Sequence, residues 1–292
     1  MSADAAAIVA PRGSRWGLWR RQTLVVARLE LARSVFAWRS LWLLFLAFAP
    51  TFIIASHAVH ERFHVLRPSA AHCNLEEETL ILAGIIQVFY MRCGIFFGCL
   101  GVFVRLIRGE AIEHTLHYPF LAPLRREVLL VGKFLAGAIT TITIFGAGVF
   151  TSFALMYAHF DAGRDFVWNG PGLAHLRAYM LVSVLACLGY GAVFLALGLA
   201  LRNPIVPAVL VFLWEGINGA LPVWMKHFSV TFYLKPLCPV ELPIEGISGL
   251  FTVVAEPTPP WLAVSGLIAF VGLIVAFACW RIRHLEISYS TD

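Results

Sequence analysis

The sequence has few charged residues for its length. Only 13% of its 292 residues are Asp, Glu, Lys or Arg, and 60% are hydrophobic. In a soluble globular domain about 25% of the residues are charged. This shortage of charge excludes an ordinary soluble enzyme. A disordered chain is excluded as well, because so many apolar residues would leave too much apolar surface in water. The remaining class is an integral membrane protein.

Motifs for nucleotide binding and catalysis are also lacking. The pattern G-x-x-x-x-G-K-[ST], which cradles nucleotide phosphates, does not occur, since Gly132-Lys133 is followed by Phe134. Any ATP hydrolysis must therefore come from another polypeptide, which would carry the ATP and magnesium. No Ser-His-Asp, Cys-His or paired-carboxylate arrangement is evident either. We expect a chain that is not itself an enzyme and binds no cofactor.

Cysteines are too few and too dispersed for a disulfide scaffold, with six in the whole chain. Cys73 and Cys238 both fall in segments predicted to lie on the outer side. A disulfide between them is one alternative in an oxidising compartment. Two free thiols are the other.

Long runs without charge are abundant. A helix needs roughly 20 apolar residues to cross about 30 Å of hydrocarbon, and hydrocarbon offers no partner to an unpaired peptide group. The sequence therefore predicts an all-α domain over residues 40–281 with six transmembrane helices. Their expected bounds are 41–58, 80–104, 134–158, 178–201, 203–225 and 257–280. The fifth begins with Pro204 and Pro207, which fit a first turn better than a helix interior.

Basic residues are distributed unevenly among the connections. Seven lie in the N-terminal segment 1–39 and five in the connection 105–133. When all connections are counted, the side with the N-terminal segment has fifteen Lys and Arg residues and the other side has six. Because Lys and Arg concentrate on the cytoplasmic side, we expect both termini, including the tail 282–292, in the cytoplasm. The protein would be a multi-pass protein of the cytoplasmic (inner) membrane. Nucleic acid is not needed to explain the net charge of +5.

The N-terminal stretch 16–40 is predicted to form a helix in the membrane interface. Its apolar residues recur at helical spacing on one face, with arginines beside them that can reach lipid phosphates. The alternative is that this helix extends the first span. The residues of the apolar face are Leu18, Val25, Leu29, Ala32 and Phe36.

The connection 105–133 is charged and is broken by Pro119 and Pro123. A connection that only returned the chain to the membrane would be shorter. Its pattern favours a docking surface for a soluble partner, and the alternative is a solvated hairpin.

This connection resembles a known family. Its pattern "E…TL…P…R-E…GK" is similar to the one that follows the second span in permease subunits of type-2 ATP-binding-cassette (ABC) exporters. The six spans, the interfacial helix and the long last outer connection are similar as well. The residues that carry the resemblance are Glu110, Thr115, Leu116, Pro123, Arg125, Arg126, Glu127, Gly132 and Lys133.

The resemblance implies a dimer of permease subunits, each touching a separate ATPase through a coupling region from Glu110 to Arg126. Glu113 and Glu127 fall in or beside that region. The substrate would be a hydrophobic or amphiphilic compound moved outward. The importer-type coupling loop is not matched, because Val-Leu follows Glu127. A membrane-embedded enzyme and an ion-coupled secondary transporter remain as alternatives.

The outer connection 226–256 is unusually apolar. Pro236, Pro239 and Pro243 exclude one long helix. We expect a re-entrant segment between the fifth and sixth helices that acts as an outer gate or as a hydrophobic lid.

Two charges fall within predicted spans, Arg92 in the second and Glu215 in the fifth. A charge at the membrane centre costs roughly 3 kcal/mol on insertion scales, so such residues face a bundle interior or each other. We hypothesise that Arg92 and Glu215 approach one another near the substrate path. The alternative is a purely structural polar pair.

Three histidines follow the first span, at positions 57, 60 and 64. On a continuing helix His57, His60 and His64 share a face, which is compatible with a metal or a pH-sensitive site. Polar residues at a membrane boundary are the simpler interpretation, so no metal site is predicted.

Overall fold

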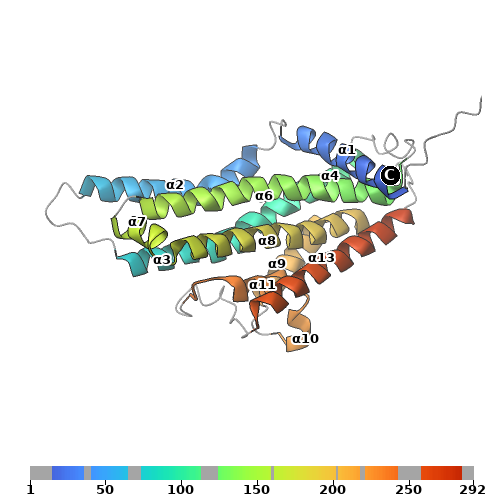
Figure 1. Cartoon of the computed structure of the whole chain (residues 1–292). Helices are drawn as coiled ribbons and strands as arrows, with labels where there is room; N and C mark the ends of the chain where they lie inside the picture. Colours follow the sequence, from blue (N-terminus) through green and yellow to red (C-terminus); the bar gives the residue numbers. More distant parts are fainter. Residues whose placement is uncertain are drawn as a thin grey trace, which may run out of the picture.

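The computed structural model of the chain describes residues 15–35, 41–64, 74–112, 124–158, 161–201, 203–217, 221–242 and 258–284. Every regular element within these ranges is a helix. Figure 1 shows an elongated bundle in which long helices run side by side, with the short helices α10 and α11 along one flank. The predicted all-α class is confirmed for the described part of the chain.

Five helices within the described ranges are long and apolar enough to cross a membrane. One of them is continuous through three segments, α3, η2 and α4, and together they carry the second predicted span. The elements are α2 (Leu41–His64), α3 (Leu75–Gly84), η2 (Ile85–Gly94), α4 (Ile95–Ile112), α6 (Arg126–Ala158), α8 (Gly172–Ala200) and α13 (Pro260–Arg283). The chain is therefore a multi-pass membrane protein.

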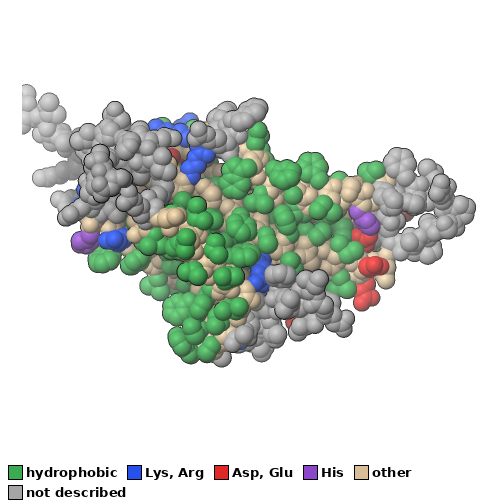
Figure 2. Space-filling model, turned by 180° about the vertical axis from the view of Figure 1, so that it is seen from behind, with side chains coloured by type: hydrophobic (Ala, Val, Ile, Leu, Met, Phe, Trp, Pro, Cys, Tyr) green, Lys and Arg blue, Asp and Glu red, His purple; other side chains and the backbone are tan. Residues whose placement is uncertain are grey.

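Polar side chains are distributed as this class requires. Figure 2 shows hydrophobic side chains over the middle of the bundle, with most of the visible Asp and Glu side chains at one end. The charged ends face water or headgroups when the apolar middle lies in hydrocarbon.

The fifth predicted span is much shorter in the structure. Helix α9 (Ile205–Gly216) has 12 residues, which at about 1.5 Å per residue extend about 18 Å. That is less than the hydrocarbon thickness of about 30 Å. Pro204 is its N-cap and Pro207 lies in its first turn, as the sequence predicts. The number of crossings in this part stays a prediction.

The segment after α9 is folded into short pieces. They are α10 (Val223–Lys226), α11 (Val230–Leu234) and the 3-10 turn η4 (Lys235–Leu237). The absence of one long helix in 221–242 agrees with the prolines of this segment. Residues 243–257, which complete the predicted re-entrant segment, lie outside the described residues.

Helix α1 (Arg15–Val35) packs along the beginning of α6 and is separate from α2 (Figure 1). Its apolar stripe of Leu18, Val25 and Leu29 is exposed and faces away from the bundle. A second helical face packs inward through Ala27 and Glu30. An outward apolar stripe is what an interfacial helix needs, while its depth in a membrane stays a prediction.

The long helices approach closely where residues are small. A Cβ added at Gly148 of α6 would lie 2.5 Å from the carbonyl oxygen of Ala47 in α2. The hydroxyl of Tyr90 donates a 2.7 Å hydrogen bond to that same oxygen. Small residues at such crossings let backbones approach, as is common in membrane bundles.

The beginning of α6 brings the two ends of the described chain together. Arg125, just before α6, lies over the ring of Trp19 in α1, and Glu127 forms an ion pair with Arg283 at the end of α13. Helix α7 (Asp161–Trp168) follows the other end of α6. Helix α1 and the end of α13 therefore lie at one end of the bundle, and α7 lies at the other (Figure 1).

Candidate functional site

A buried polar site lies where η2, α9 and α11 meet. The segment η2 is a π-helix of 10 residues, a form that is rare in proteins and occurs frequently at functional sites. It carries the buried residues Gln87, Tyr90 and Arg92. All three side chains lie inside the bundle, where most of the buried residues are apolar.

Glu215 at the end of α9 binds the beginning of α11. Its carboxylate accepts hydrogen bonds from the hydroxyl of Ser229 at 2.7 Å and from the backbone N–H groups of Val230 at 2.8 Å and Thr231 at 3.1 Å. The first N–H groups of a helix have no partner within the helix, and the positive end of the helix dipole favours an anion there. Glu215 is 2% exposed, so this carboxylate acts as a buried cap of α11.

Arg92 of η2 lies against the last turn of α9. A Cβ added at Gly216 would be 2.5 Å from the guanidinium Nη2 atom, so no larger residue fits at position 216 without moving the arginine. Arg92 therefore lies beside the residue that follows Glu215. The two charges singled out from the sequence are both buried in this site, and their role in transport stays a prediction.

Other residues of this site were missed from the sequence. The side-chain amide of Gln87 donates a 2.7 Å hydrogen bond to the carbonyl oxygen of Val240. The hydroxyls of Tyr190 and Thr231 lie 3.1 Å apart. Gln87 stands in an apolar run, which is a weak signal. Its partner is a backbone atom far along the chain, which no residue pattern indicates.

Cys238, directly after η4, has a free thiol. Its sulfur lies 3.7 Å from the sulfur of Met91. Burial raises the pKa of this thiol to about 12, although the nearby Lys235 acts in the opposite direction. Burial also lowers the pKa of Lys235. Cys73, the other half of the disulfide alternative, lies outside the described residues.

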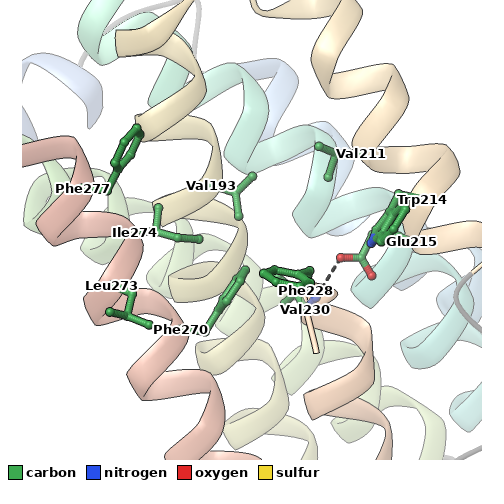
Figure 3. Close-up of a pocket in the computed structure, with 10 residues that line it drawn as sticks. All are labelled: Val193, Val211, Trp214, Glu215, Phe228, Val230, Phe270, Leu273, Ile274 and Phe277. Carbon is green, nitrogen blue, oxygen red and sulfur yellow. Dashed lines mark hydrogen bonds between the residues drawn. The ribbon is translucent and has the colours of Figure 1, made fainter. Parts of the chain in front are cut away.

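A pocket of about 490 Å³ adjoins Glu215 (Figure 3). It lies between α8, α9, α13 and the segment before α11. Figure 3 places the residues of α13 on one side and Trp214 and Glu215 of α9 on the other. The lining residues are Val193, Val211, Trp214, Glu215, Phe228, Val230, Phe270, Leu273, Ile274 and Phe277.

The predicted coupling region is described only at its edges. Glu113, Thr115, Leu116 and Pro123 lie outside the described residues, and Glu110 is in the last turns of α4. The guanidinium carbon of Arg125 lies 4.4 Å from the centre of the Trp19 ring, a cation–π distance. Arg126 and Glu127 form the first turn of α6, and their role in coupling stays a prediction.

Lys133 forms a buried junction near the same end. Its ammonium donates a 2.8 Å hydrogen bond to the carbonyl oxygen of Leu106 in α4 and lies 3.2 Å from the carboxylate of Glu30 in α1. The side chain of Lys133 is 3% exposed. In the sequence, Lys133 belongs to the exporter-like motif of the connection 105–133, which was predicted to be a docking surface. Its burial under α1 was not predicted.

The first of the three histidines has an acidic partner. The Nε2 atom of His57 lies 3.1 Å from Glu78 Oε1, which ties α2 to α3. The side chains of His60 and His64 are not among those described. Across the described side chains, no group of three or more His, Cys, Asp or Glu residues is arranged to hold a metal ion.

The fold and the buried site define a multi-pass helical membrane protein with charged residues inside its bundle. A comparison of the chain with models of known families found no match, and a comparison with curated proteins found none. The function is therefore argued from the residues and their geometry.

Proposed function

We propose that this chain is the permease subunit of a type-2 ABC exporter, with ATP bound and hydrolysed by a separate cytoplasmic subunit. A second permease subunit, identical or related, would complete the membrane part. The substrate would be a hydrophobic or amphiphilic compound. The multi-pass helical fold and the motif that begins at Glu110 suggest this class, and a junction of helices carries the proposal further.

The junction at the beginning of α6 is the observation that carries this proposal. Arg125 lies over Trp19 of α1, Lys133 contacts Glu30 of α1 and Leu106 of α4, and Glu127 forms an ion pair with Arg283 of α13. A soluble partner that moved the beginning of α6 would move these three helices with it. A partner shifts a conformational equilibrium only through contacts that differ in free energy between the two states.

A continuous path leads from this end to the buried site. Helix α4 continues without a break into η2, which carries Arg92 beside α9. Glu215 at the end of α9 holds α11. A displacement of α4 would therefore reach the outer segment through the close approach of Arg92 to α9 and the hydrogen bonds of Glu215 to α11, as an exporter driven from the cytoplasm requires.

The test is ATP hydrolysis by the complex isolated from membranes in mild detergent through a tag on this chain. We expect vanadate-sensitive hydrolysis that is absent from the chain alone. Arg125→Glu reverses an exposed charge at the coupling end and should lower this activity, whereas the matched change Arg164→Glu in α7 should not. An intact complex that hydrolyses no ATP would contradict the proposal.

A secondary transporter is the second candidate, and the shape of α9 favours it. Transporters of that class often have discontinuous helices whose ends bind substrate or ions near the membrane centre. Helix α9 is short, and the N-terminus of α11 faces the carboxylate of Glu215. Transport that follows an ion gradient in vesicles without ATP would support this candidate over the first.

A further inference from the structure

The pocket beside Glu215 opens between α9 and α13. Its walls are α13 residues such as Phe270 and Ile274 on one side and Trp214 on the other, and Val193 of α8 also lines it (Figure 3). Helix α9 has only 12 residues, which leaves it shorter than the hydrocarbon layer beside the longer α13.

The chemistry of the lining selects an apolar occupant. Among the described residues that line it, Glu215 is the only charged one, and that carboxylate already accepts hydrogen bonds from Ser229, Val230 and Thr231. Apart from the indole N–H of Trp214, the aliphatic and aromatic side chains of the walls offer no hydrogen bond to a polar group. A polar ligand would lose its hydrogen bonds to water without replacement, which is costly.

The position of the pocket determines which apolar molecule can enter. Leu273 and Phe228 are 72% and 64% exposed, and Leu273 belongs to the middle of a helix long enough to span a membrane. Hydrocarbon chains of lipid therefore surround this opening. A volume of about 490 Å³ lies within the range of ligand sites, and burying an apolar molecule against these side chains is favourable.

We propose that this pocket binds one acyl chain of a membrane phospholipid. The acyl chain enters sideways between α9 and α13 and lies against Phe228 and Val230, the two residues that flank Ser229. An occupied pocket therefore supports the hydrogen bond from Ser229 to Glu215 and holds α11 in place. This site goes beyond the proposed function, because it requires only that the protein spans a membrane.

The test uses the full chain in nanodiscs of phosphatidylcholine that carries a photoactivatable diazirine on one acyl chain. After irradiation, adducts are mapped by mass spectrometry. We expect them to concentrate at Val193 and Ile274. Leu273→Trp should lower the yield at Val193 by about tenfold, the effect of losing roughly two methylene contacts. Ile268→Trp, at another exposed position of α13 outside the pocket lining, should leave the yield unchanged.

A second variant, Val211→Trp, fills the pocket from α9 and should also lower the adduct yield at Val193. It replaces Leu273→Trp in the test if that variant does not fold. Equal adduct yields at Ile268 and at the pocket residues would overturn the proposal, because they indicate ordinary contact with surrounding lipid. Disulfide-linked dimers of Leu273→Cys without lipid adducts at Val193 would also overturn it, in favour of a second copy as the occupant.

Discussion

The hydroxyl of Ser229 donates a 2.7 Å hydrogen bond to the carboxylate of Glu215, inside a bundle whose buried residues are mostly apolar. This contact joins the end of α9 to the beginning of α11. Both residues are almost completely buried, so water does not compete for the bond. The relationship explains how the short α9 and the short α11 keep fixed positions without long helices of their own.

Removing the acceptor should destabilise the protein. In Glu215→Ala the Ser229 hydroxyl and two backbone N–H groups lose their partner, and a buried unsatisfied group costs about 1–3 kcal/mol. Glu215→Gln keeps one carbonyl oxygen and should be milder. Thermal unfolding in detergent measures the order. Glu241→Ala, an exposed carboxylate in the same segment, is the control, and an equal effect of Glu241→Ala and Glu215→Ala would refute this role.

Breaking the buried junction at Lys133 should be more severe. Lys133→Met leaves the carboxylate of Glu30 buried without its cation, and breaking such a pair from one side costs about 3–5 kcal/mol. The double change Lys133→Met with Glu30→Leu removes both charges and should recover part of the lost stability. Arg28→Met, at an exposed position of α1, is the control. A double variant no more stable than Lys133→Met would show that the two charges are not coupled.

Gly132 allows α1 to lie close to α6. An added Cβ would be 2.7 Å from Cγ1 of Val26 and 3.1 Å from the carbonyl oxygen of Thr23, so Gly132→Ala should push α1 away and expose it to protease. At Gly272 of α13 nothing lies within 4 Å of the added Cβ, so Gly272→Ala should leave cleavage unchanged. Equal cleavage rates in the two variants would mean that α1 is not held at Gly132.

The thiol of Cys238 should resist alkylation at pH 8. Because burial raises its pKa to about 12, the thiolate is scarce until the pH approaches that value, and only the thiolate reacts. In a variant with Cys238 as the single cysteine, we expect labelling by iodoacetamide only after denaturation. A cysteine in place of the exposed Trp168 of α7, outside the membrane-spanning helices, should react at once. Rapid labelling of folded Cys238 at pH 8 would contradict the raised pKa of this thiol.

The lengths of the apolar runs in the sequence predicted most of the fold. Runs without charge indicated α2, α6, α8 and α13 to within several residues at most ends, because each helix must cover the hydrocarbon with its own residues. The length of α9 was not predictable in this way. Its end is fixed by the bonds of Glu215 to Ser229 and the next two residues, and an apolar run does not reveal such contacts.

The site was predicted only in part. Arg92 and Glu215 were visible as charges in apolar runs, whereas Val230 and Thr231 contribute backbone N–H groups that any residue carries. The residues of η2 read as an ordinary span, because their pattern does not distinguish a π-helix from an α-helix. Lys133 was interpreted as part of a surface connection, because its neighbours in the sequence do not indicate that α1 covers it.

The most direct measurement asks whether the beginning of α6 faces the compartment that holds ATP. Single cysteines at Arg125 and at Trp168, which is 74% exposed at the opposite end of the bundle, are labelled with a membrane-impermeant maleimide. The account predicts that position 125 reacts only in inside-out vesicles and position 168 only in intact cells. Labelling of position 125 from outside intact cells would contradict it, because no cytoplasmic ATPase could then reach α6.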